Sequence, residues 1–229
     1  MRALFLGVLL AVPSAAFADS NFTRTSSAPI TLQAVLEQFK KYDKDLVSLK
    51  TQFSQSLRMT DAPMSQSVEG TIVYAKPYRF RIEHSKPARQ SVVSDGIDVW
   101  VHRHDRNQVV QAKLVDWRNA DPTIDHLLRF GRYAELLETY AVELATAGAE
   151  QAIILTPKKE ADGDFTLRLA LAVDTLFPEM ADMTVGGVTM RTKFETTEFN
   201  AKYDPKLFDF KPPPDADVFR NFKPPKFTP

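Results

Sequence analysis

Apolar residues follow two different periods along this chain, and the first is helical. After Thr31, a residue that can cap a helix, the apolar positions that share one helical face are Leu32, Val35, Leu36 and Phe39. The same stripe can be followed to Leu46 and Leu49. The pattern predicts an amphipathic helix that begins at residue 32 and extends toward residue 49.

Beyond residue 50 the apolar period changes to two, which is typical of strands that bury one face. Before residue 115 the alternation falls on Phe53, Leu57, Met59, Val68, Ile72, Tyr74, Phe80, Ile82, Val109, Val110 and Leu114. Later alternations fall in 140–144, 153–155, 165–173, 177–184 and 188–199. Turn residues such as Asp95-Gly96 and Gly186-Gly187 separate the runs, so the pattern predicts about eleven antiparallel strands.

Between the two sets of strands, residues 121–138 return to a helical spacing. Asp121-Pro122 is a start signal, and Ile124, Leu127 and Leu128 follow on one face. The predicted fold class is therefore mainly β with helices (α+β), in which a large sheet curls and two short helical segments cover its inner face. Periodicity leaves two outcomes open: an inside filled by the helices, or an inside left partly empty for a ligand.

The two ends of the chain differ from the middle. Arg2, an apolar run from Ala3 to Val12 and a small-residue ending at Ala18 form the three parts of a secretory signal peptide, so 1–18 is predicted to be cleaved after Ala18. The next residues, 19–30, are predicted to form a flexible lead-in, and 31–220 a single domain. Residues 221–229 are predicted to form a proline-rich tail.

Charge and sulfur content exclude several classes of function. The chain has 29 Lys and Arg against 29 Asp and Glu, and a surface that neutralises phosphates needs a surplus of cations, so no nucleic acid is expected as a partner. The chain has no cysteine, which excludes disulfides, thiolate chemistry and lipid attachment through a cysteine side chain.

Candidate catalytic and metal-binding residues are few. His102 and His104 would project from one face of a strand beside Asp105, but a metal site would need a further ligand such as His84 or His126. The sequence lacks Gly-x-Ser-x-Gly and a glycine-rich phosphate loop. We therefore predict no enzymatic activity, no metal and no cofactor.

A resemblance to a known family is carried by the stretch from Gly70 to Glu83, GTIVYAKPYRFRIE. Its glycine, strand, basic-Pro pair and aromatic strand resemble the signature stretch of the periplasmic lipoprotein carrier family, LolA. Further matching segments are Phe53-Ser54-Gln55, Pro87, 93–96 with Trp100, 107–108, 121–122 with 127–128, 155–158 and 208–213. The similarity covers most of 31–220.

The resemblance implies an open antiparallel half-barrel of about eleven strands covered by a helical lid. Members of the family take acylated lipoproteins from an inner-membrane ABC-type release complex, carry them across the periplasm and deliver them to an outer-membrane lipoprotein receptor. That receptor resembles this fold but is anchored through a cysteine, so this chain is similar to the mobile carrier. A carrier is expected to be a periplasmic monomer, because its mouth must meet two partners.

The resemblance also assigns roles to residues. The acyl chains are expected to lie in a cavity lined by Phe53, Ile72, Phe80, Ile82, Trp100, Ile124, Leu127 and Leu128. The family usually has Arg before the proline, where it bonds lid carbonyls and holds the lid closed. Here that residue is Lys76, which keeps the charge but lacks the planar fork of donors.

Two other functions fit the same fold, because a fold does not fix a function. One is a sensor or regulatory module of the cell envelope that reports on mislocalised lipoproteins. The other is a carrier of another lipid, or an accessory to a different exporter.

Overall fold

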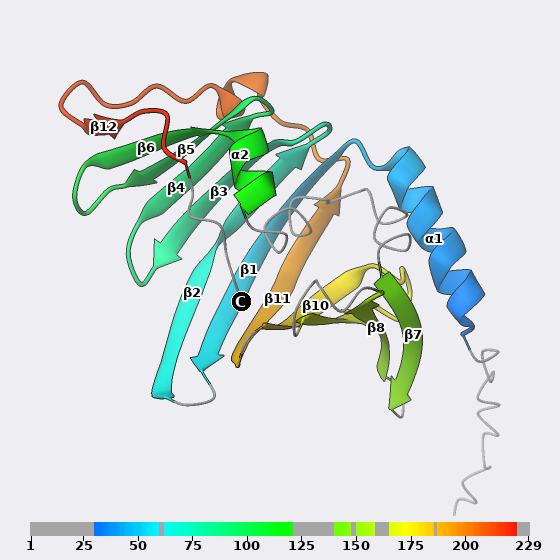
Figure 1. Cartoon of the computed structure of the whole chain (residues 1–229). Coiled ribbons are helices and arrows are strands. Elements are labelled where there is room, and N and C mark those ends of the chain that lie inside the picture. The colour runs from blue at the N-terminus through cyan, green and yellow to red at the C-terminus, as the bar shows by residue number, and fades with distance from the viewer. Residues whose placement is uncertain are drawn as a thin grey trace, which may run out of the picture.

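The described part of the chain forms one curled, open sheet. The computed structural model describes residues 30–59, 62–120, 140–147, 150–158, 165–185 and 187–223. Their 12 strands lie in the order β12-β6-β5-β4-β3-β2-β1-β11-β10-β9-β8-β7 (Figure 1). Neighbouring strands are antiparallel, except that β12 runs parallel to β6. The predicted fold class, an open antiparallel half-barrel, is confirmed.

The elements that precede residue 121 are α1 (Leu32–Asp45), β1 (Ser48–Met59), β2 (Ala62–Ala75), β3 (Arg79–Lys86), β4 (Gln90–Asp95), β5 (Asp98–Arg103), β6 (Gln108–Lys113) and α2 (Leu114–Ala120). Those that follow residue 139 are β7 (Tyr140–Ala147), β8 (Glu150–Pro157), β9 (Phe165–Leu171), β10 (Pro178–Val185), β11 (Val188–Phe199), the 3-10 helix η2 (Pro205–Phe208) and β12 (Asp217–Phe219). The second helical segment predicted at 121–138 lies outside the described residues.

The helix α1 begins where the sequence predicts but ends earlier. The Thr31 hydroxyl accepts a hydrogen bond from the Ala34 N–H at 3.2 Å, as an N-cap does. The helix stops at Asp45, and Leu49 belongs to β1, so the predicted extension toward residue 49 is wrong. Leu46 and Leu49 are both buried. Their positions are apolar because they are buried and not because they lie on a helix, which is why the apolar stripe continues past the helix end.

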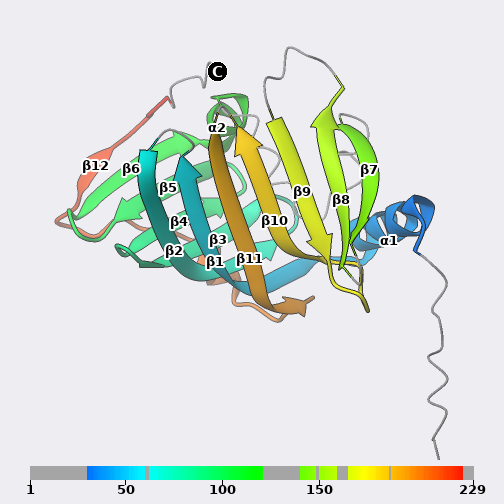
Figure 2. The same ribbon diagram turned by 90° about the horizontal axis from the view of Figure 1, so that it is seen from below.

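Side chains alternate between an inner and an outer face of the sheet. We call inner the face that carries Leu49, Tyr74, Phe80 and Leu167, which form one buried cluster with Val35 and Phe39 of α1. In β9 the predicted alternation is confirmed, because Leu167, Leu169 and Leu171 join this cluster while Arg168 makes ion pairs on the opposite, outer face. Figure 2 shows the curl of the sheet from a second direction.

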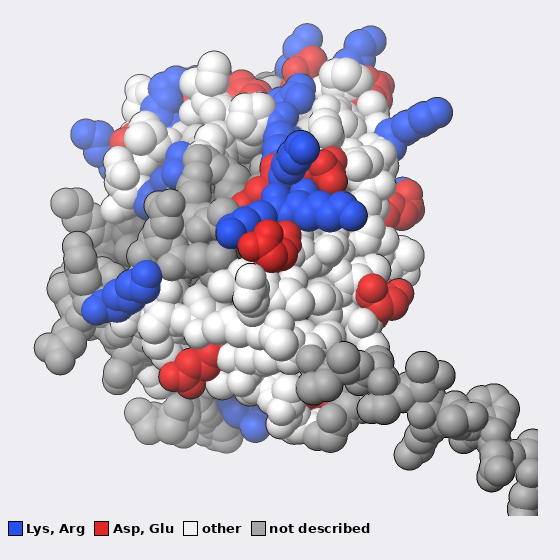
Figure 3. All heavy atoms as spheres, turned by 90° about the vertical axis from the view of Figure 1, so that its right-hand side faces the viewer, with Lys and Arg blue, Asp and Glu red and all other residues white. Residues whose placement is uncertain are grey.

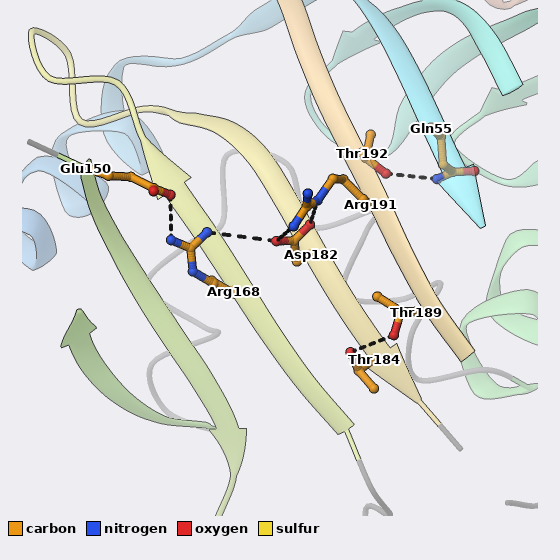
Figure 4. A network of polar contacts seen from close by, with 8 residues as sticks. All are labelled: Gln55, Glu150, Arg168, Asp182, Thr184, Thr189, Arg191 and Thr192. Atoms are coloured by element: carbon orange, nitrogen blue, oxygen red, sulfur yellow. Dashed lines mark hydrogen bonds and ion pairs between the residues drawn. The ribbon is translucent and has the colours of Figure 1, made fainter. Parts of the chain in front are cut away.

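Part of the outer face carries a row of ion pairs across four strands. Arg168 contacts Glu150 at 2.5 Å and Asp182 at 3.9 Å, and Arg191 contacts Asp182 at 2.6 Å (Figure 4). Cations and carboxylates thus alternate from β8 to β11, which favours this register over one that places like charges opposite each other. The guanidinium–carboxylate hydrogen bonds raise the pKa of Arg191.

The other part of the outer face is covered by residues 200–223, which we call the C-terminal segment. Phe208 is buried there, the Phe210 ring lies 6.0 Å from the ring of Trp100, and β12 pairs with β6. From Lys211 onward the sequence predicts an extended proline-rich end and no strand. The described residues nevertheless form one strand more than the predicted eleven, because β12 lies in that stretch.

A short helix also replaces the predicted end of a strand. The alternation through Val109 and Val110 continues only to Lys113, and Leu114 begins α2, where it is buried in the inner cluster. A buried leucine fits the apolar pattern of a helix and that of a strand equally well, so the sequence does not show where the strand ends. In the described ranges, no helix combines the length and the apolar character that crossing a membrane requires.

Gly70 gives a test of this packing. A Cβ atom at Gly70 would lie 2.2 Å from the Glu83 carbonyl oxygen of β3 and 2.9 Å from the Phe53 ring. We expect Gly70→Ala to lower the free energy of unfolding by about 2 kcal/mol or more, because backbone atoms must move. Urea unfolding measures the change. The neighbouring Thr71→Ala, at an exposed position, should stay within about 0.5 kcal/mol of wild type.

Candidate functional site

The inner face of β2 to β6 is a continuous apolar surface. Across these five strands a single row of paired residues is apolar throughout and consists of Ile72, Ile82, Val92, Val101 and Val110. In the next row, Tyr74 pairs with Phe80. The structure thus brings together three residues predicted from the sequence, since Ile72, Phe80 and Ile82 share one face.

Phe53 extends this surface onto β1. It lies opposite Phe194 of β11 and Gly70 of β2, and only 6% of its surface is exposed. Its ring meets the imidazole of His84 edge-on, with 5.8 Å between the ring centroids. The missing side chain of Gly70 leaves the space that the Phe53 ring occupies.

Trp100 lies on the other side of the sheet. Its neighbours Val99 and Val101 face the inner cluster, while Trp100 pairs with Val93 and Gln111 and its ring lies near Phe210 of the C-terminal segment. The prediction that Trp100 lines the same cavity as Phe80 is therefore corrected. The physical reason is the alternation of side chains in β5.

The predicted lid residues Ile124, Leu127 and Leu128 lie outside the described residues, so their role remains a prediction. Helix α1, in contrast, lies against the inner cluster through Val35 and Phe39. Its opposite side is polar, with an exposed Lys40–Glu37 ion pair at 3.3 Å. Figure 3 shows Lys and Arg side chains gathered over the upper half of the side that carries α1.

Lys76 connects this helix to the turn between β2 and β3. Its ammonium donates a hydrogen bond to the carbonyl oxygen of Asp43, in the last turn of α1. Its backbone N–H donates to the Val47 carbonyl at 2.9 Å. The last carbonyls of a helix lack partners within the helix and carry partial negative charge, so a lysine satisfies both their hydrogen bonding and their charge.

Asn200 holds the same helix end from the other side and was not identified from the sequence. Its amide oxygen accepts from the Val47 N–H at 2.7 Å, and its amide nitrogen donates to the Asp45 carbonyl at 3.1 Å. Asn200 has a φ of 53°, in the left-handed region that asparagine tolerates. An asparagine just after a strand was the available signal, but the sequence does not show that it contacts a helix more than 150 residues away.

A polar network crosses the outer face below the C-terminal segment. The Glu83 carboxylate accepts from Arg81 Nε at 2.6 Å and from the Ser91 hydroxyl at 2.6 Å, and the Ser91 oxygen lies 2.8 Å from His104 Nε2. Because the Ser91 proton is donated to Glu83, the His104 nitrogen must be the donor toward Ser91. His104 therefore does not act as a base on this serine, which is the role that a nucleophilic serine requires.

Of the four histidines, His126 lies outside the described residues, and the other three are not grouped into a metal site. The rings of His102 and His104 lie on one face, as predicted, with centroids 4.0 Å apart. Within the described ranges, however, no three His, Asp or Glu side chains are grouped so that they could hold a metal ion. Burial lowers the pKa of His104, and the nearby His102 lowers it further.

The site thus offers an apolar surface on the inner face of β2 to β6, and Lys76 connects the β2–β3 turn at its border to the end of α1. Such a surface removes hydrocarbon from water without any reacting group, and each buried CH₂ contributes about 0.8 kcal/mol. Electrostatics matter mainly at its border, where Lys76 and Asn200 hold α1.

Comparisons with known proteins agree with this geometry. The family model described as outer membrane lipoprotein carrier protein LolA matches residues 44–211. The outer-membrane lipoprotein carrier protein of Chromohalobacter salexigens is 31% identical over 95% of this chain and 96% of its own. That of Methylococcus capsulatus is 30% identical over 86% and 91%. A crystal structure of an uncharacterized conserved protein from Thermus thermophilus shares the fold, with a TM-score of 0.52, 15% identity and coverage of 82% and 98%.

Lys76 can be tested through the mobility of α1. Lys76→Leu removes the donor to Asp43, so we expect hydrogen exchange in the last turn of α1 to accelerate about fivefold, as expected for a lost contact of about 1 kcal/mol. Lys76→Arg should restore protection. Lys50→Leu is the matched control, since the Lys50–Glu198 pair is exposed and does not touch α1. Equal exchange in Lys76→Leu and wild type would show that the contact does not hold the helix.

The burial of His84 predicts that the free energy of unfolding falls in acid. Burial lowers the pKa of His84 below its usual 6.5, and Glu83 offsets this in part. The unfolded chain then binds protons at a higher pH than the folded chain, so this contribution to stability is lost as the pH falls through 6.5. We expect His84→Phe, which keeps a ring beside Phe53, to weaken the fall in unfolding free energy between pH 7 and pH 5. A slope identical to wild type would contradict the assignment.

Proposed function

Because the chain belongs to the LolA family of outer membrane lipoprotein carrier proteins, we propose that it is a periplasmic carrier that holds the acyl chains of lipoproteins on the inner face of its sheet. The observation that supports this most directly is the apolar row that crosses β2 to β6 from Ile72 to Val110. It offers hydrocarbon contacts along several strands at once.

The size of the hydrophobic effect determines how such a carrier must work. At about 0.8 kcal/mol per CH₂, one long acyl chain gains roughly 10 kcal/mol on leaving water, so release into water would be very slow. We propose that cargo is taken directly from an inner-membrane ABC-type release complex and passed directly to an outer-membrane receptor. A monomer whose mouth is free would suit both encounters.

Opening of the cavity is assigned to the helices. We propose that α1, with the segment that carries Ile124, Leu127 and Leu128, covers the apolar surface in the empty carrier and moves away when acyl chains take the place of the helix side chains. Lys76 would hold the closed state through the last turn of α1. The proposed lining now comprises Phe53, Ile72, Phe80 and Ile82, without Trp100.

Localisation follows from the same proposal. We infer that residues 1–18 direct export and are removed after Ala18, so that the mature protein works between the two membranes. The role requires no chemical reaction and no cofactor, because cargo is bound and released unchanged.

The test is native mass spectrometry of the mature protein after co-expression with an acylated lipoprotein or with its non-acylated Cys→Ala counterpart. We expect a one-to-one complex with the acylated form alone. Ile82→Asn, which puts a polar group on the apolar row, should reduce the complex about tenfold, a cost near 1.4 kcal/mol. Lys50→Asn, at an exposed position on β1, is the control. A folded protein that binds neither form would contradict the carrier function.

A further inference from the structure

A polar row crosses the outer face and contrasts with the apolar row of the inner face. Gln52 pairs with Thr71, Thr71 with Glu83, Glu83 with Ser91, and Ser91 with His102. At the β1 end the row continues to β11, where a bulge places Glu195 beside Gln52. One polar residue from each of six neighbouring strands therefore lies in a continuous line.

This row forms the floor of a groove of about 630 Å³. Besides five residues of the row, from Glu195 to Ser91, the groove is bordered by Arg81, by Ser85 and Arg89 at the β3–β4 connection, and by His104 just after β5. The groove thus opens at the rim of the sheet, where strands end. Neighbouring strands lie about 4.8 Å apart, so the distance from β11 to β4 is about 19 Å.

The groups free to bind a ligand are spread along this length. Among the described residues, the side chains of Gln52, Thr71 and Arg89 form no hydrogen bond or ion pair. The carboxylate of Glu195 has one long contact, from the Ser54 hydroxyl at 3.5 Å. A guanidinium at the rim, an amide and a hydroxyl in the middle, and a carboxylate at the far end are therefore available.

These groups select a class of ligand. The described lining sets three carboxylates, of Glu69, Glu83 and Glu195, against two guanidinium groups, of Arg81 and Arg89, so it lacks the surplus of cations that a phosphate chain requires. Among the described residues of the lining, Phe53 is the one Phe, Tyr or Trp, and it is buried, so the lining offers no exposed Phe, Tyr or Trp ring for base stacking. An amide and a hydroxyl between a cationic and an anionic end suit an extended polar peptide. About 19 Å corresponds to five or six extended residues.

We propose that this groove binds the first residues of the cargo polypeptide, the flexible stretch that follows the acylated residue; this inference rests on the proposed function. The acyl chains would occupy the inner face, and the polypeptide would pass around the strand ends at the β3–β4 turn onto the outer face. Every strand that the groove crosses has a neighbour on both sides, so its backbone groups are already paired and recognition uses side chains.

The charges fix a polarity for the bound peptide. Entry at the rim places an acidic residue near Arg89 at the start, and a basic residue near Glu195 at the end. The probe is therefore a fluorescein-labelled hexapeptide amide, Asp-Ser-Asn-Ser-Ser-Lys, compared with the same peptide in which Asp and Lys are exchanged. Fluorescence anisotropy with the full mature protein measures both affinities.

We expect the acid-first peptide to bind at least tenfold more tightly than the exchanged one, and the double variant Arg89→Glu/Glu195→Lys to invert that preference. Gln52→Ala with Thr71→Ala should weaken both peptides, whereas Lys50→Ala, outside the groove, should change neither. Urea unfolding verifies that each variant is folded. No saturable binding to wild type, or a preference that the double variant leaves unchanged, would overturn the inference.

The two proposals fail separately. Wild-type protein that captures the acylated lipoprotein in native mass spectrometry but binds neither peptide contradicts only the groove assignment. Protein that binds the acid-first peptide but captures no acylated lipoprotein contradicts the carrier function, and with it the assignment of this peptide as cargo.

Discussion

The molecule depends on the register of its strands. A single sheet separates an apolar row, Ile72 to Val110, from a polar row, Gln52 to His102, and the backbones of the same strands carry both. A slip of one residue in any strand would exchange the faces of its side chains. Both the apolar and the polar surface therefore exist only when the strands pair in this register. On β8 to β11 the alternating charges of Glu150, Arg168, Asp182 and Arg191 strengthen it.

The end of α1 is held by a second kind of interaction, which is polar and local. The helix lies against the inner face through Val35 and Phe39, a contact that hydrocarbon could replace at little cost. Lys76 and Asn200 instead bond carbonyls that hydrocarbon cannot satisfy. The helix is therefore held by two contacts of different chemistry, one apolar and one polar, and an apolar ligand could replace only the first.

Sequence reasoning succeeded where periodicity reports burial. The alternation in β9 and that of Phe80 with Ile82 in β3 follow from a period of two, and the start of α1 follows from Thr31. It failed where two patterns coincide. Trp100 stands between Val99 and Val101, and because all three are apolar the sequence does not show which of them face the inner cluster; the strand pairing and the contact with Phe210 do. Leu114 fits a strand and a helix equally.

The residue types at the site could be predicted from the sequence, but the groups that they contact could not. A basic residue at position 76 is visible in the sequence, but its acceptor on Asp43 depends on how the helix lies against the sheet. Asn200 and the polar row depend on strand pairing over long separations, and no local signal in the sequence encodes this pairing.

The pair at the centre of the sheet has a consequence for how the protein is made. β1 and β11 lie side by side although their residues are far apart, and the Thr51 and Thr197 hydroxyls that meet there are separated by 146 positions. The two halves of the sheet therefore join only after nearly the whole chain has emerged, and contacts of such separation form slowly. A chain that stays unfolded until its synthesis is almost complete can be threaded through a narrow translocation channel before its sheet closes.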